Sequence, residues 1–290
     1  MDFLTRLTSG RPIVADGAMG TMLQAAGLPP GKTGEFWVLE RPDAIAAVHR
    51  AYVEAGADLI LTCTFGGTRP RLARSGLADR VAEVNRRAVE IARQAAAGQA
   101  LVAGDIGPLG ELLAPLGKLS YQEAVDLFAE QAAALAEAGA DVLYVETMSA
   151  LDEARAAVEG ARRAAPHLPV TLTFSFDTHG RTNMGVRPEQ AAKAALEWGV
   201  AAFGANCGTT LEMTREALEK MQAAAPDAIL IAKPNAGLPR MVEGKPVYDA
   251  TPEMMADFAA RAVALGARIV GGCCGSSPAH IQAIARRLAA

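Results

Sequence analysis

The chain has 290 residues, of which 51% are hydrophobic and 21% are charged, so it contains enough apolar material for a large core. Its 28 basic and 32 acidic side chains give a net charge of -4, without the basic excess typical of nucleic-acid binding. No uncharged apolar run reaches the roughly 18 residues of a membrane span, and the N-terminus lacks a signal-peptide pattern. We therefore expect a cytoplasmic protein with neither a nucleic-acid nor a membrane partner.

Eight short apolar segments rich in β-branched residues predict buried strands. They lie at 12–15, 58–65, 101–106, 141–147, 170–176, 201–207, 229–234 and 268–273. Ala-rich segments with helical periodicity alternate with them, at 42–55, 80–97, 121–138, 151–165, 188–198, 210–224, 252–265 and 278–288. This alternation favours an α/β fold of the (β/α)8 TIM-barrel type as a single domain over residues 1–290, although the pattern alone leaves an open doubly wound sheet possible.

Glycines and loop lengths add detail to the predicted barrel. Gly56, Gly139 and Gly266 follow predicted helices within the phrases Ala-Gly-Ala-Asp and Leu-Gly-Ala-Arg, where a left-handed residue commonly ends a helix. The longest irregular segments, 27–41, 107–120 and 236–251, each follow a predicted strand. In a barrel, loops in that position surround the active site.

The four cysteines point to a metal site. Cys207 ends the sixth predicted strand and the adjacent Cys273 and Cys274 end the eighth, so all three converge on one rim, whereas Cys63 is expected to be a small core residue. Three thiolates leave a tetrahedral zinc ion with one open position, as in catalytic sites. Buried free thiols and a glycine-rich phosphate loop are the alternatives, but a phosphate loop needs no cysteines.

Adjacent residues of a regular strand point to opposite faces, so the two neighbouring cysteines reach one metal only if the chain turns there. We expect Gly271, Gly272 and Gly275 to supply the backbone freedom for that turn.

Six segments carry a resemblance to a known family. They are DGAMGTMLQ at 16–24, TCTFGGT at 62–68, VET at 145–147, NC at 206–207, PNAG at 234–237 and GGCCG at 271–275. From end to end the chain resembles the homocysteine S-methyltransferase family, and within it is most similar to the homocysteine-binding module of cobalamin-dependent methionine synthase. The resemblance implies a zinc-dependent methyltransferase that converts L-homocysteine to methionine.

The resemblance also implies roles for individual residues. Cys207, Cys273 and Cys274 would bind zinc and activate the substrate thiol, and Asn235 would fill the fourth zinc position before substrate arrives. Asp16, Gly17 and Glu146 would hold the amino-acid end of homocysteine. From the residues alone, Asp16 and Glu146 are equally compatible with structural hydrogen bonding or helix capping.

The proposed metal suits the chemistry, because a free thiol near pH 7 is mostly protonated while its thiolate is the nucleophile. Zinc with three cysteinates and a substrate thiolate has a formal charge of 2 - 4 = -2, which leaves the substrate sulfur nucleophilic.

The methyl donor is expected to be separate, because eight βα units use nearly the whole chain and leave no room for a folate or cobalamin module. A methylcorrinoid such as methylcobalamin, presented by a separate corrinoid protein, is the first expectation. Betaine and S-methylmethionine are the alternatives. Gly66 stands where betaine-using relatives have an aromatic residue, although Trp37, Tyr52 or Tyr144 offer another cation site.

Two other classes stay open. Lys233, at the end of the seventh predicted strand, fits a Schiff-base aldolase, although a buried lysine is more often paired with a carboxylate. A non-catalytic protein that binds zinc and thiols also fits the cysteines. The histidines form no metal-ligand spacing and are expected in solvated or helix-end positions: His49, His167, His179 and His280.

Overall fold

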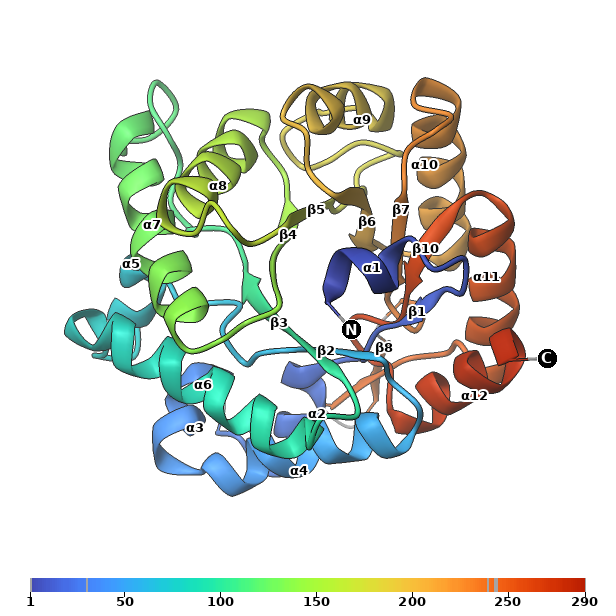
Figure 1. Ribbon diagram of the computed structural model, residues 1–290, viewed down its shortest axis with the longest axis horizontal. Coiled ribbons are helices and arrows are strands. Elements are labelled where there is room, and N and C mark those ends of the chain that lie inside the picture. Colours follow the sequence, from blue (N-terminus) through green and yellow to red (C-terminus); the bar gives the residue numbers. More distant parts are fainter. Residues whose placement is uncertain (1, 30, 239, 243–244, 290) are drawn as a thin grey trace.

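The computed structural model describes residues 2–29, 31–238, 240–242 and 245–289. Eight parallel strands form one sheet in the order β1-β10-β7-β6-β5-β4-β3-β2 (Figure 1). Their bounds are β1 Ile13–Val14, β2 Leu59–Leu61, β3 Leu101–Ile106, β4 Val142–Met148, β5 Val170–Phe174, β6 Ala202–Cys207, β7 Leu230–Pro234 and β10 Ala267–Val270. Backbone hydrogen bonds from Asp58 to Val14 (2.7 Å) and from Asp16 to Leu59 (2.9 Å) join the two ends of this order. The predicted (β/α)8 barrel is thereby confirmed.

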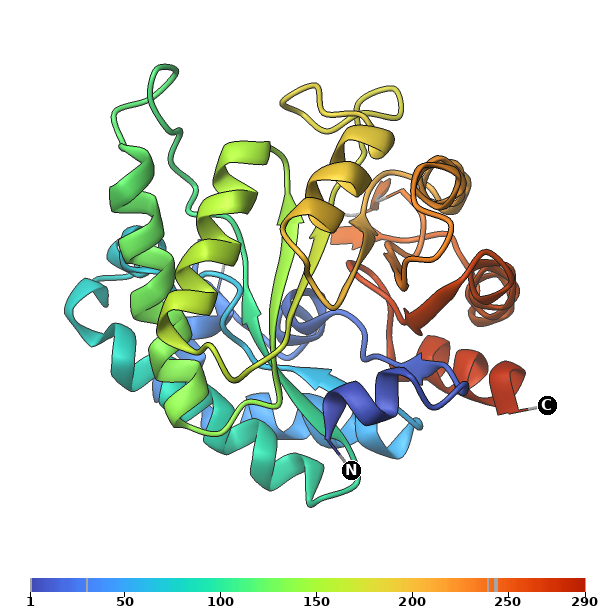
Figure 2. The same cartoon turned by 45° about the horizontal axis from the view of Figure 1, so that its top comes forward.

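Among the described residues, eight helices of ten residues or more alternate with the strands of the sheet, and both ribbon views show them on the outside of the barrel (Figures 1 and 2). They are α4 Pro42–Glu54, α6 Val81–Ala96, α7 Tyr121–Glu137, α8 Leu151–Ala164, α9 Pro188–Glu197, α10 Leu211–Ala224, α11 Pro252–Ala264 and α12 Pro278–Ala289. Each bound lies within one residue of its prediction. Small residues let neighbouring helices approach closely: a Cβ added at Gly160 of α8 would lie 2.6 Å from the carbonyl oxygen of Val125 in α7.

The first helix, α1 (Phe3–Leu7), closes one end of the barrel. Its buried Phe3 and Leu7 pack with side chains of the barrel interior, among them Ile13, Tyr144 and Ile231. In Figure 2, α1 lies at the end opposite the loops that follow β3 and β5. The amino-terminal end of the barrel is therefore plugged with apolar side chains, and the carboxyl ends of the strands remain available for a site.

Short elements occupy segments that were expected to be irregular. The predicted loop 27–41 contains α3 (Gly34–Glu40), and 236–251 contains an antiparallel hairpin of β8 (Arg240–Val242) and β9 (Lys245–Val247). The other additions are α2 (Met19–Ala25), α5 (Arg69–Ala73) and a 3-10 turn, η1 (Ala78–Arg80). These elements are too short to show a clear period in the sequence.

The strands β2 and β10 end four and three residues earlier than predicted. After β2, Thr64 donates its backbone N–H to the carbonyl oxygen of Thr62 (2.8 Å), which turns the chain. After β10, the backbone N–H groups of Gly271 and Cys273 still donate to the carbonyl oxygens of Ala232 (3.0 Å) and Pro234 (2.7 Å) in β7. Both strands end where the chain reaches the rim of the barrel.

The repeated Ala-Gly-Ala-Asp phrase has a structural role. Gly56, Gly139 and Gly266 have φ values of 98°, 93° and 99°, which confirms the predicted left-handed helix ends. The aspartate that follows then fixes the next strand to its neighbour: Asp58 accepts a hydrogen bond from the Val14 N–H (3.0 Å), and Asp141 accepts one from the Val102 N–H (2.7 Å). Among the described helices, none combines the length and apolar character required to cross a membrane.

Candidate active site

A cavity of about 290 Å³ opens at the carboxyl ends of the strands. Six residues singled out from the sequence line it together: Asp16, Gly17, Glu146, Cys207, Cys273 and Cys274. The lining also contains Lys233, which was considered for Schiff-base chemistry, and three charged side chains that were not predicted: Glu35, Arg71 and Asp105. The cavity lining therefore combines a cluster of thiols with several carboxyl groups.

The three thiols form a compact cluster. The Sγ of Cys207 lies 3.1 Å from that of Cys273 and 4.0 Å from that of Cys274, and all three atoms lie within 4.8 Å of one another. A tetrahedral zinc ion with bonds of about 2.3 Å would hold its sulfur ligands roughly 3.8 Å apart. The donor set therefore fits zinc, and within the described residues it is the one group of His, Cys, Asp and Glu side chains close enough to hold a metal.

The thiols also change one another's acidity. Hydrogen bonds from Cys207 and Cys273 lower the pKa of Cys274 to about 4. The same contacts, first with Cys273 and then with Cys274, raise the pKa of Cys207 well above its ordinary value. The cluster thus favours one thiolate stabilised by two protonated neighbours, and a dication would take over the role of those two protons.

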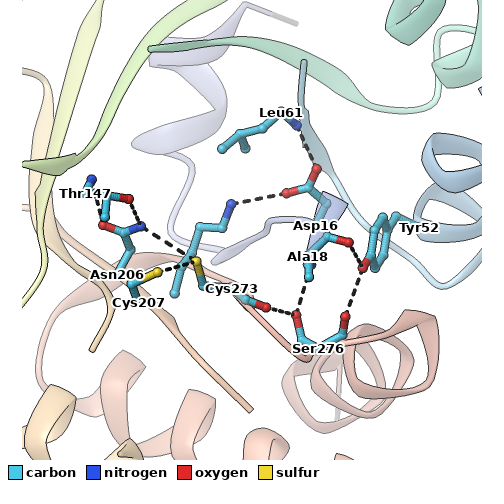
Figure 3. A network of polar contacts seen from close by, with 10 residues as sticks. Asp16, Ala18, Tyr52, Leu61, Thr147, Asn206, Cys207, Cys273 and Ser276 are labelled. Carbon is cyan, nitrogen blue, oxygen red and sulfur yellow. Dashed lines mark hydrogen bonds and ion pairs between the residues drawn. The ribbon is translucent and has the colours of Figure 1, made fainter. Parts of the chain in front are cut away.

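Asn206 fixes the end of β6 beside this cluster (Figure 3). Its Oδ1 accepts hydrogen bonds from the Thr147 N–H (2.9 Å) and the Thr173 hydroxyl (2.8 Å), and its Nδ2 donates to Thr147 Oγ1 (2.7 Å). Thr147 and Cys207 both adopt left-handed backbone angles, with φ of 62° and 57°, which are uncommon for residues with a side chain. Asn206 therefore clamps the ends of β4, β5 and β6 around the unusual turn that presents Cys207.

The glycines beside the cysteine pair act in two different ways. Gly275 has a φ of 78°, as expected for a turn that needs glycine. Gly271 and Gly272 do not adopt left-handed angles, so the expectation of backbone freedom was wrong for them. They are needed for close packing instead, because a Cβ at Gly271 would lie 2.7 Å from the Asp16 carbonyl oxygen and one at Gly272 would lie 2.3 Å from Ser276 Oγ.

A second network ties the first strand to the cysteine loop (Figure 3). Ser276 Oγ donates to the Cys273 carbonyl oxygen (2.6 Å) and accepts from the Ala18 N–H (3.1 Å). The Tyr52 hydroxyl lies 2.9 Å from the Ala18 carbonyl oxygen and 3.1 Å from that of Ser276. Gly17 is confined by the same groups, since a Cβ there would lie 2.6 Å from Ser276 Oγ. The backbone at Gly17 is therefore held at the cavity without a side chain.

Asp16 and Lys233 form a buried ion pair on the polar side of the cavity. The Lys233 Nζ lies 3.2 Å from Asp16 Oδ1, and Asp16 Oδ2 accepts the Leu61 N–H (2.8 Å; Figure 3). Burial alone would lower the pKa of Lys233, but Asp16 and Glu146 outweigh it and raise that pKa. This is the carboxylate pairing that we considered for Lys233, whereas a Schiff-base lysine needs a lowered pKa.

Glu146 and Asp105 are two further buried carboxyl groups of the lining. Burial raises the pKa of Glu146 to about 8, against the opposing effect of Lys233. Burial, followed by the nearby Glu146, raises the pKa of Asp105 well above its ordinary value. A cationic ligand in the cavity would therefore lower the pKa of both carboxyl groups and favour their charged forms.

Comparison with known proteins assigns this arrangement to a family. The family described as "Homocysteine S-methyltransferase" matches residues 13–288. The chain belongs to the homocysteine S-methyltransferase family. It is 36% identical to a methionine synthase of Mycobacterium tuberculosis over 99% of its own length and 25% of the relative. A methionine synthase of Mycobacterium leprae is also 36% identical, over 96% of this chain and 24% of the relative. The chain thus spans about a quarter of the length of these curated relatives.

A solved structure resembles the whole barrel. The homocysteine methyltransferase MmuM from Escherichia coli, in its metallated form, superposes with a TM-score of 0.80 at 28% identity, and the match covers 96% of each chain. This likeness confirms the single-barrel fold. Membership of the homocysteine S-methyltransferase family also agrees with the resemblance that the six sequence segments carry.

In this member of the family, Asn235 lies behind Cys207. Its backbone N–H donates to the Cys207 carbonyl oxygen (3.2 Å), and its Nδ2 donates to the Gly208 carbonyl oxygen (2.7 Å). Its Oδ1 is buried and has no partner among the described residues, but Asn235 is absent from the cavity lining. Asn235 is thus bonded to the backbone around Cys207, and its role as the fourth zinc ligand stays a prediction.

The aromatic side chains considered for a cation site lie away from the cavity surface. Trp37 is buried, with Arg41 over its ring at 4.9 Å, and Tyr144 lies beneath Lys233, 5.4 Å from the ring centroid. With Tyr52 tied to Ser276, none of the three aromatics considered for a cation site belongs to the lining. Cys63 is buried as predicted, and it also contributes to the cavity lining.

Two histidines, His280 and His49, have different surroundings. His280, at the start of α12, lies 2.9 Å from Ser277 Oγ and 3.0 Å from the Ala250 carbonyl oxygen, which confirms a helix-end role. For His49 the expectation was wrong. It is completely buried in α4, and neither ring nitrogen has a partner among the described residues.

Proposed function

We propose that the chain is a zinc-dependent homocysteine S-methyltransferase, which transfers a methyl group from a separate donor to the thiol of L-homocysteine to form methionine. The observation that carries the proposal is a single cavity lined by three clustered thiols and by buried carboxyl groups. A thiol that also bears an α-amino group can use both, with its sulfur at the cysteines and its ammonium group at the carboxyl groups. The metallated form of the related Escherichia coli enzyme supports the metal.

Cys207, Cys273 and Cys274 would hold the zinc, with Asn235 as a fourth ligand that leaves when substrate arrives. Zinc at this position would lower the pKa of the substrate thiol, so that a thiolate is available near neutral pH. The protein itself contributes the fixed geometry. Asn206 and the left-handed turn at Cys207 set the position of the thiols before any ligand binds, and such preorganisation lowers the cost of binding.

The amino-acid end of homocysteine would bind at the carboxyl groups of the lining. Glu146 offers a buried carboxyl group to the α-ammonium, Asp16 orders the Lys233 ammonium beside it, and Gly17 lets the substrate approach the backbone closely. The surrounding side chains are largely buried, so these polar contacts would act in a medium of low dielectric constant and would be strong. Substrate orientation, with the sulfur directed toward the thiols, would follow from this polarity.

For the donor, we propose a methylcorrinoid such as methylcobalamin, carried by a separate corrinoid protein. The methionine synthase relatives and the local sequence support this choice. A quaternary ammonium donor would need an aromatic cage. Among the described residues, the lining contains one aromatic side chain, Phe65. The Arg71 guanidinium already lies over its ring, 5.6 Å from the centroid.

The test measures zinc content and methionine formation with methylcobalamin, betaine and S-methylmethionine supplied in parallel. We expect about one zinc ion per chain and turnover with methylcobalamin, both lost in the Cys207→Ala variant. Cys63→Ala is the matched control, because Cys63 borders the cavity but lies outside the cluster, and it should keep its zinc. Undiminished methionine formation in a metal-free variant lacking Cys207, Cys273 and Cys274 would refute the proposal.

A further inference from the structure

Asp105, at the end of β3, is a carboxyl group of the cavity for which the proposed function has no use. The residue is 4% exposed and lines the cavity. Its Oδ1 is buried and has no hydrogen-bond partner among the described residues. Buried carboxyl oxygens are normally hydrogen-bonded, because an unpaired one forfeits its hydration. An oxygen left in this state beside an accessible cavity indicates that a ligand supplies the missing partner.

The backbone of Asp105 is held firmly in place. Its N–H donates to Thr62 Oγ1 (3.0 Å), and its carbonyl oxygen accepts from the Thr64 hydroxyl (2.7 Å) and from Gln131 Nε2 (3.1 Å). These contacts join β3 to the segment after β2 and to α7. The carboxyl group therefore cannot find a protein partner through a small backbone shift, and its unpaired oxygen is a fixed property of the site.

The cations of the lining do not satisfy Asp105. Lys233 is bound to Asp16 at 3.2 Å, and Arg71 lies over the ring of Phe65. Asp16, in contrast, already has a donor at each oxygen, from Lys233 and from the Leu61 N–H. The carboxyl groups of the cavity thus outnumber the ammonium group available to them, and Asp105 has the greater unused capacity to accept hydrogen bonds.

We propose that Asp105 is a specificity-determining residue that binds the α-ammonium group of the thiol substrate together with Glu146. The inference rests on the proposed function and deepens it. An ammonium group has three N–H donors, so it can serve more than one carboxyl group at once. The raised pKa values of Asp105 and Glu146, which arise mainly from burial, are consistent with groups that become charged when a cation arrives.

The experiment compares two thiols that differ only in the amino group: L-homocysteine and 4-mercaptobutyrate. Their dissociation constants are measured by titration calorimetry on the zinc-loaded protein without any methyl donor. Asp105→Asn keeps the size of the side chain and removes its charge. We expect this variant to bind homocysteine at least tenfold more weakly, with less than a twofold change for 4-mercaptobutyrate. Equal changes for both thiols, or no change for either, would overturn the inference.

Controls separate this inference from the proposed function. Asp177→Asn is the matched variant, because Asp177 also has an unpartnered Oδ1 but lies outside the cavity lining, and its affinity for homocysteine should not change. Wild-type protein that binds neither thiol would instead refute the proposed thiol site itself. If Asp105→Asn fails to fold, Asp105→Ser is titrated with the same two thiols, and the same outcomes decide.

Discussion

At the scale of single residues, the buried pair of Lys233 and Asp16 shows how one contact decides between two readings of a side chain. Burial alone would depress the pKa of the lysine and suit it to Schiff-base chemistry. The carboxylate at 3.2 Å reverses the direction of that effect. The Lys233 ammonium group is therefore a fixed part of the cavity lining. Its removal would leave the Asp16 carboxylate without a cationic partner.

Replacing Lys233 with methionine should destabilise the fold, because Asp16 would keep only the Leu61 N–H as a donor. Removing one member of a buried ion pair typically costs about 3 to 5 kcal/mol, and urea unfolding measures this loss. The double variant Lys233→Met/Asp16→Asn should recover part of it, since an asparagine oxygen can still accept from Leu61 without an unpaired charge. Equal unfolding midpoints for the wild type and Lys233→Met would contradict the pairing.

The site residues divide into those that sequence patterns reveal and those that only atomic contacts reveal. Cys207, Cys273 and Cys274 were predicted because thiols at strand ends converge on one rim in any parallel barrel. Asp105 and Asn206 were missed. Nothing in the sequence shows that an aspartate oxygen lacks a partner, or that an asparagine holds its neighbour in a left-handed conformation, because both depend on which polar atoms meet after folding.

At the scale of elements, the length of the periodic pattern determines what the sequence predicts. The helices around the barrel are 10 residues or longer and were predicted to within one residue, because several turns repeat the same apolar face. The seven-residue α2 and α3 and the three-residue β8 and β9 were not predicted. Elements of this length do not repeat an apolar face, so the sequence contains no period that would reveal them.

His49 in α4 makes the stability of the whole fold depend on pH. Burial lowers its pKa from 6.5 to about 4, so between these values the unfolded chain binds a proton that the folded chain does not. Stability should therefore fall as the pH drops from 6.5 to 4, by about 3 kcal/mol from this residue. His49→Leu should remove that contribution, and urea midpoints across this pH range measure the difference. Parallel profiles for the two proteins would show that His49 does not titrate in this way.

At the scale of the whole molecule, the barrel is closed by its shortest strand. The strand β1 has two residues and meets β2 through few backbone hydrogen bonds. The side chain of Asp58 reinforces this seam, because it accepts from the Val14 N–H (3.0 Å) and from Arg6 of α1 (2.9 Å). The same Asp-to-backbone contact recurs inside the sheet, where Asp141 binds the Val102 N–H and Arg93 (both 2.7 Å).

These two aspartates permit a matched test of where the barrel opens. Asp58→Ala and Asp141→Ala each remove a carboxylate that accepts from one backbone N–H and one arginine, and each should lower the free energy of unfolding by about 1 to 3 kcal/mol. The two variants should differ in which strands lose protection of their amides from hydrogen exchange. Since β1 has little other support, Asp58→Ala should sharply increase the hydrogen exchange of amides in β1 and β2, whereas Asp141→Ala leaves the longer ladder of β3 and β4 protected. Equal loss of protection around both sites would mean that the β1–β2 seam is no weaker than the rest of the barrel.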